Sequence, residues 1–136
     1  MTDQHEYATW TARWTGGVSA KVFGRGHSIA ADEPPEFGGN DAGPMPTEIL
    51  VAALASCFCM ALAWSATRRG VELTSLEVDV RAERAGKEPR HGAYDIWIRS
   101  SVPPETLTSL VALAKRVCWV SNTLATPPEI RYHLPD

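Results

Sequence analysis

The sequence predicts an α+β fold, in which antiparallel strands pack against two helices. Residues 5–31 and 76–99 alternate apolar and polar side chains with the period of two that is typical of strands, and turns interrupt both regions. Residues 46–69 and 104–118 instead carry apolar side chains at helical spacing. Along the chain, the expected order of strands and helices is βββ-α-ββ-α-β. Consecutive strands joined by turns pair as hairpins, which makes the sheets antiparallel.

Length and charge limit the class of protein. The chain has 136 residues, the usual size of one domain, so we expect a single domain over 1–136. The net charge is −3 without a cluster of Lys and Arg, which argues against a nucleic-acid or membrane-surface partner. The N-terminal residues do not resemble a signal peptide. An odd number of cysteines, all within apolar segments, argues against a secreted disulfide framework, so we expect a cytoplasmic protein.

The first region predicts three strands. Residues 8–14 and 18–22 alternate on either side of the turn Thr-Gly-Gly at 15–17, and residues 27–31 form a third short strand. The segment 32–46 is rich in Gly and Pro, which predicts a loop. A loop of this length in a small domain is expected to be functional or held against a surface.

The region 46–69 predicts a helix that is apolar on nearly all faces. Pro46 and Glu48 suit its first turn, and Arg68 suits its last turn. The apolar run 49–64 is short for a membrane span and rich in alanine, so a buried core helix is the better interpretation. A chain this small has little material with which to surround such a helix, which predicts a two-fold homodimer.

The second half predicts a hairpin, a helix and a last strand. The hairpin covers 76–81 and 94–99, and the helix begins near Pro104 and ends near Cys118. A short helical continuation is expected at 121–124. The final strand is expected to carry three alternating apolar side chains, Ile130, Tyr132 and Leu134.

The three cysteines are the candidate functional residues, because a thiolate is both nucleophilic and reversibly oxidisable. Cys57 and Cys59 are two residues apart on one helix and point about 200° away from each other, so they cannot form a disulfide in an intact helix. Cys57 and Cys118 lie on the apolar stripes of the two helices and can meet if both stripes face one core. They could then act as a redox pair.

Two other interpretations of the cysteines stay open. Free cysteine is often a small buried hydrophobe without a chemical role. A zinc site is not favoured, because the sequence has no Cys-x-x-Cys and its histidines lie in predicted strands or loops. These histidines are His5, His27, His91 and His133. No nucleotide-binding or serine-hydrolase motif occurs, and we expect neither a metal nor a cofactor.

Two cysteine motifs carry a resemblance to a known family. The stretch 43–58 reads Gly-Pro-Met-Pro-Thr-Glu-Ile-Leu-Val-Ala-Ala-Leu-Ala-Ser-Cys-Phe, and residues 117–124 read Val-Cys-Trp-Val-Ser-Asn-Thr-Leu. With the element order, these motifs resemble the OsmC/Ohr family of osmotically inducible and organic hydroperoxide resistance proteins over essentially the whole chain. The wording Pro-Thr-Glu-Ile-Leu is closer to the less characterised OsmC-like branch.

The resemblance implies both a fold and an activity. It implies an OsmC-like fold, with antiparallel sheets packed on two central helices in an intertwined homodimer whose active site lies at the interface. It also implies a thiol peroxidase of oxidative stress defence that reduces organic hydroperoxides. Cys57 would be the peroxidatic thiol and Cys118 the resolving thiol, and an external dithiol would reduce their disulfide.

The sequence departs from the family pattern where the thiolate is activated. In the best-studied branch an arginine follows the early Thr-Gly-Gly, but Val18 stands there in this chain. The arginine could be replaced by Arg25, or equally by Arg13 or Lys21. The second departure is Thr47, which stands where that branch has the glutamate that positions the arginine. Glu48 is a candidate for this carboxylate, although it lies on roughly the opposite helix face from Cys57 and a first-turn glutamate also simply favours the helix dipole.

A third departure is Trp119, which replaces the proline that usually follows the second cysteine. It adds a large apolar wall near the expected site. Together with the missing arginine it supports an alternative function, a non-enzymatic OsmC-like dimer that binds a small apolar ligand at its interface.

Overall fold

The computed structural model of the chain describes residues 7–136. His5, one of the histidines weighed above as metal ligands, lies outside the described residues. The chain divides into two compact units, the first extending to Leu50 and the second covering Val51–Asp136. Each unit is described by itself, and the single domain over 1–136 stays a prediction.

The first unit contains a three-stranded antiparallel sheet in the order β1-β2-β3. Its strands are β1 (Thr11–Gly16), β2 (Ser19–Gly24) and β3 (His27–Ala31). The turn after β1 needs glycine, because Gly16 and Gly17 have φ angles of 112° and 54°. The predicted hairpins are therefore confirmed, although β1 begins three residues later than the alternation suggested.

The long loop of the first unit is held by backbone hydrogen bonds and by one buried carboxylate. Asp32 is 2% exposed. It accepts backbone N–H bonds from Glu33 at 2.8 Å and from Asn40 and Ala42 at 3.1 Å. These bonds, that of Ala42 first, hold the pKa of Asp32 below its usual value. The loop, which includes a short 3-10 turn η1 (Pro35–Phe37), is thus tied at its base.

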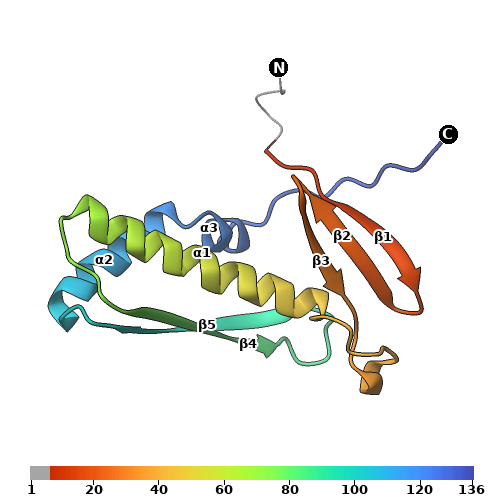
Figure 1. Cartoon of the computed structure of the whole chain (residues 1–136), viewed down its shortest axis with the longest axis horizontal. Coiled ribbons are helices and arrows are strands. Elements are labelled where there is room, and N and C mark those ends of the chain that lie inside the picture. The colour runs from red at the N-terminus through yellow and green to blue at the C-terminus, as the bar shows by residue number, and fades with distance from the viewer. Residues whose placement is uncertain (1–6) are drawn as a thin grey trace. The chain divides into compact units, whose positions relative to one another are not determined.

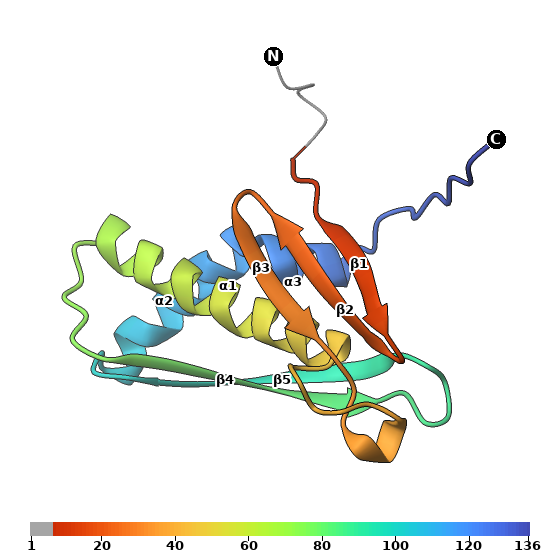
Figure 2. The same ribbon diagram turned by 45° about the vertical axis from the view of Figure 1, so that its right-hand side comes forward.

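The second unit is a hairpin covered by helices. β4 (Leu76–Arg84) pairs with β5 (His91–Ser100) in an antiparallel register that places Val78 opposite Ile98 and Val80 opposite Ile96. Figure 1 and Figure 2 show α2 (Pro104–Val117), α3 (Trp119–Ala125) and the part of α1 (Pro46–Arg68) from Val51 onward on one face of this hairpin. The predicted α+β class is confirmed.

The core of the second unit lies between the hairpin and the helices. Its buried residues come mainly from α1 and α2, and alternate side chains of β4 and β5 pack against them, as the sequence pattern predicts. They are Phe58, Ala61, Leu62, Ala66, Val102, Leu110, Ala114 and Cys118.

α1 is buried on one side only within this chain. By length and composition it could cross a membrane, but its apolar residues Leu54, Phe58 and Leu62 are at most 3% exposed inside the molecule, so it is a core helix. On its other side Met60 is 70% exposed and Trp64 is 46% exposed. The prediction of a homodimer requires such an exposed apolar side.

The predicted last strand is wrong. Residues 127–136 have no regular structure, and the side chains of Ile130, Tyr132 and Leu134 are 71–87% exposed. The physical reason is that a strand is stable only when its backbone pairs with a neighbour. Within residues 7–136 the paired strands are β1 with β2, β2 with β3, and β4 with β5, so this segment pairs with none of them.

Candidate dithiol site

Cys57 lies in the middle of α1, at the edge of the helix face that packs on the core. It continues the stripe that begins at Leu54 and runs on to Ala61, and it packs half-buried against the core. Cys59 is also half-buried but is not among the residues that pack on this core. Helical phase therefore separates the two thiols as the sequence predicts, and only Cys57 reaches the other helices.

Cys118 occupies the bend between α2 and α3. Its backbone is extended there, with φ −75° and ψ 104°, and its residue is completely buried. Its N–H donates to the carbonyl of Ala114 at 2.9 Å, and its own carbonyl accepts the N–H of Asn122 at 3.1 Å and the hydroxyl of Ser121 at 3.2 Å. The bend thus fixes the thiol in the core from both sides.

The fold brings Cys57 and Cys118 together, as the two helical stripes predict. The pKa of the Cys57 thiol is raised above its ordinary value, first by burial and then by the neighbouring Cys118 side chain. The backbone N–H groups of Val120 and Trp119 act in the opposite direction, because they stabilise the thiolate. All three cysteines are free thiols, so the pair is described in its reduced form.

The amides of Val120 and Trp119 are functional groups that the sequence reasoning missed. They belong to the first turn of α3, which follows directly after Cys118. The signal in the sequence was the motif after Cys118, which we expected to turn helical only at residue 121. Within the second unit no lysine or arginine side chain is among the groups that shift the pKa of Cys57.

All candidates for the activating cation, and the Glu48 carboxylate that would position it, belong to the first unit. The Glu48 carboxylate accepts the backbone N–H of Met45 at 3.0 Å, which caps the start of α1 as the helix-dipole interpretation suggests. Arg25 is exposed in the turn between β2 and β3, with φ 49°. Of the other candidates, the Arg13 guanidinium lies 5.1 Å from the centre of the Phe23 ring, and Lys21 is exposed on β2.

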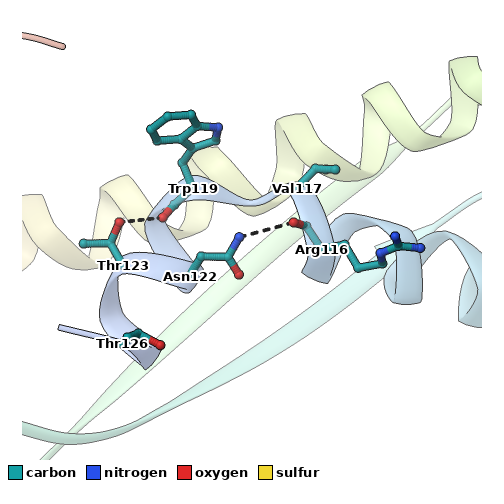
Figure 3. Close-up of a pocket in the computed structure, with 6 residues that line it drawn as sticks. All are labelled: Arg116, Val117, Trp119, Asn122, Thr123 and Thr126. Carbon is teal, nitrogen blue, oxygen red and sulfur yellow. Dashed lines mark hydrogen bonds between the residues drawn. The ribbon is translucent and has the colours of Figure 1, made fainter. Parts of the chain in front are cut away.

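A groove of about 530 Å³ lies beside the bend at Cys118. Figure 3 shows the six residues that line it, with Arg116 and Val117 before the cysteine and the others after it. The Asn122 amide donates to the Arg116 carbonyl at 3.2 Å, which bridges the bend. Trp119, which replaces the family's proline, is 66% exposed and lines the groove.

Metal ligands do not gather in the described part of the chain. Among residues 7–136 no three His, Cys, Asp or Glu side chains come close enough together to hold an ion.

The second unit is thus an α+β arrangement in which two cysteines meet between a central helix and a helix bend. The sequence of residues 38–133 matches the family described as OsmC-like protein. The chain belongs to this family. A search of curated protein sequences found no match.

Solved structures share the fold at low sequence identity. An OsmC-like protein from Mycoplasma pneumoniae has a TM-score of 0.77 and 18% identity, with 91% of each chain covered. An organic hydroperoxide resistance protein OsmC from Legionella pneumophila has a TM-score of 0.67 and 18% identity, with 91% of this chain and 93% of that chain covered. The protein OhrB of Bacillus subtilis has a TM-score of 0.59 and 20% identity, with 90% and 93% covered.

Proposed function

We propose that the protein is a cysteine-based peroxidase that reduces organic hydroperoxides. The observation that carries this proposal is the pair of Cys57 and Cys118, which interact across α1 and the bend before α3. A cycle of oxidation and disulfide formation needs two neighbouring thiols, one of which solvent can reach, and half-buried Cys57 is that thiol here. The names of the relatives from Legionella pneumophila and Bacillus subtilis support hydroperoxides as the substrate class.

The proposed reaction has two steps at these sulfurs. The Cys57 thiolate attacks the outer oxygen of the hydroperoxide, the O–O bond breaks, and the other oxygen leaves as an alcohol after taking up a proton. Cys57 is then a sulfenic acid, oxidised by two electrons. The Cys118 thiol condenses with it to a disulfide and releases water, and an external dithiol returns both cysteines to thiols by exchange.

The remaining partners in this proposal follow from the sequence and the family. The protein acts in the cytoplasm as a homodimer, without a cofactor, a nucleic acid or a membrane. Its physiological role is defence against oxidative stress.

The proposal is tested by following the consumption of cumene hydroperoxide with dithiothreitol as reductant. We expect turnover, and we expect the rate to rise about tenfold per pH unit from neutral pH, because only the thiolate reacts and the pKa of Cys57 is raised. The rate levels off above that pKa, which lies above the ordinary cysteine value of roughly 8.5. Cys59→Ser is the control and should leave this profile unchanged. Absence of turnover at every pH would overturn the proposal.

The activating charge is part of the same proposal. In this proposal Arg25, with Arg13 and Lys21 as alternatives, is the cation that Glu48 positions, and it offsets part of the rise in the Cys57 pKa that burial causes. Arg25→Gln should lower the neutral-pH rate by roughly tenfold and shift the profile to higher pH, while the plateau rate at high pH stays the same. Arg13→Gln and Lys21→Gln are the matched controls. A shift in either control variant, with none in Arg25→Gln, would reassign the cation.

The homodimer has a separate test. Met60 and Trp64 leave apolar surface exposed on α1, and a second copy would cover it. Sedimentation equilibrium should therefore give about twice the chain mass of 14.8 kDa. A mass that stays at 14.8 kDa over a wide concentration range would contradict the dimer.

A second candidate function is a non-enzymatic dimer that binds a small apolar ligand at its interface. Two observations favour it: burial raises the pKa of Cys57, and Trp119 stands exposed beside the bend. In this case the hydroperoxide assay gives no turnover, and a small apolar probe dye binds to the wild type with an affinity that Trp119→Ala reduces.

A further inference from the structure

The two sulfurs of the thiol pair differ in access. Cys118 has no exposed surface and is part of the core with Phe58, Leu110 and Ala114. Cys57, by contrast, is half-buried at the edge of that core. Within one chain, a reagent in solvent can therefore approach one sulfur of the pair and not the other, and the homodimer proposed above has to leave that approach open.

The backbone at Cys118 opposes any movement that would expose it. Its N–H and its carbonyl are both used, in bonds to Ala114, Asn122 and Ser121. The Asn122 amide adds a bond across the bend to the carbonyl of Arg116. Turning Cys118 toward solvent would break this set of bonds and open the core, and such local openings have low populations in well-packed regions.

We propose that the external thiol that resets the oxidised pair attacks the sulfur of Cys57, and that Cys118 is always the leaving group. This inference rests on the proposed function for its biological meaning, but its geometry depends only on the burial of the two cysteines. It adds a direction to the cycle, because the peroxide and the reductant reach the same sulfur from solvent and Cys118 never leaves the core.

The exchange step balances in atoms and electrons. The external thiolate forms a bond to the Cys57 sulfur as the bond between Cys57 and Cys118 breaks, and the Cys118 sulfur takes the electron pair and then a proton. The product is a mixed disulfide on Cys57 and a free Cys118 thiol. If the reductant is a dithiol, its second thiol attacks its own bound sulfur, which leaves Cys57 reduced and the reductant oxidised to a disulfide.

The direct test uses a disulfide made without peroxide. The Cys59→Ser variant is oxidised with diamide, treated briefly with excess 2-mercaptoethanol and quenched with N-ethylmaleimide, and its peptides are mapped by mass spectrometry. We expect mercaptoethanol on Cys57 and maleimide on Cys118. The reverse pattern, an even mixture, or failure of diamide to form the disulfide would overturn the inference. Since no hydroperoxide is used, a failed peroxidase assay and a failed mapping result are distinguishable.

Single-thiol variants give an independent measurement of the same difference. In the Cys59→Ser background, Cys118→Ser leaves only Cys57, and Cys57→Ser leaves only Cys118. An aromatic disulfide reagent should react with Cys57 at least about 100-fold faster than with Cys118 in the folded protein, because Cys118 must wait for local opening. In concentrated guanidinium the two rates should agree within about twofold, as expected for exposed thiols. Equal rates in the folded proteins would contradict the proposed direction.

Discussion

Replacing Cys57 by serine should lower the rate of hydroperoxide reduction at least about 1,000-fold. Serine keeps the shape of the side chain, but its hydroxyl is neither ionised near neutral pH nor able to be oxidised and reduced in a cycle. Cys57 is the half-exposed member of the pair, so no other core thiol can replace it at the surface. The loss should appear in the first turnover as well as in the steady state.

The measurement is the consumption of cumene hydroperoxide by purified Cys57→Ser, with Cys59→Ser as the matched control on the same helix. The control should retain the wild-type rate, because Cys59 does not pack on the core that holds Cys118. Cys118→Ser should complete one turnover and accumulate a sulfenic acid on Cys57 that dimedone labels. Steady turnover by Cys57→Ser would remove this residue from the mechanism.

Leu62→Ala should lower the free energy of unfolding by about 2–5 kcal/mol, the range for a leucine deleted from a packed core. Leu62 is 1% exposed and contributes to the core that α1 shares with the hairpin and α2. The deletion removes apolar contacts and leaves a cavity that a rigid surrounding closes only in part. The same core holds Cys118, so we also expect faster labelling of that thiol.

Urea denaturation of Leu62→Ala and wild type at one protein concentration gives the difference, and a fixed concentration matters if the protein is a dimer. Leu134→Ala is the matched control, because the same atoms are deleted from a side chain that is 87% exposed. Its effect should stay within about 0.5 kcal/mol. Equal losses of unfolding free energy in Leu62→Ala and Leu134→Ala would show that burial of Leu62 in this core does not stabilise the fold.

The sequence predicts the second unit well because its patterns are local. Alternation over 76–81 and 94–99 requires one apolar face, and β4 and β5 have it. The helix predicted over 46–69 ends at Arg68, one residue earlier than predicted. Gly70, two residues further on, adopts a φ of 65°, which is typical of the chain just after a helix end. The strand expected at 130–134 failed for the complementary reason, since its stability depends on a neighbour that no local pattern reveals.

The site was predictable only in part. Helical phase alone separated Cys57 from Cys59, whereas the pairing of Cys57 with Cys118 also needed the second cysteine motif and a core shared by both helices. The contribution of Val120 and Trp119 depends on backbone direction just after a bend, and residue types do not encode that direction. For Glu48 the pattern allowed both a catalytic and a capping role; the bond to the Met45 amide shows the capping one, and the catalytic one stays a proposal.

The Asp32 carboxylate makes part of the stability of the loop at 32–46 depend on pH in strong acid only. Its pKa is lowered from 3.8 by backbone N–H bonds, so the ionised form is favoured in the folded chain. The resulting stabilisation is fully present above the unfolded-state pKa of about 3.9 and is lost as the pH falls through the lower folded-state value. Mild acidification therefore leaves the bonds to this carboxylate in place, whereas deep acid weakens them by protonating a single side chain, and the backbone bonds from Asp32 to Pro44 and from Asp41 to Glu33 remain.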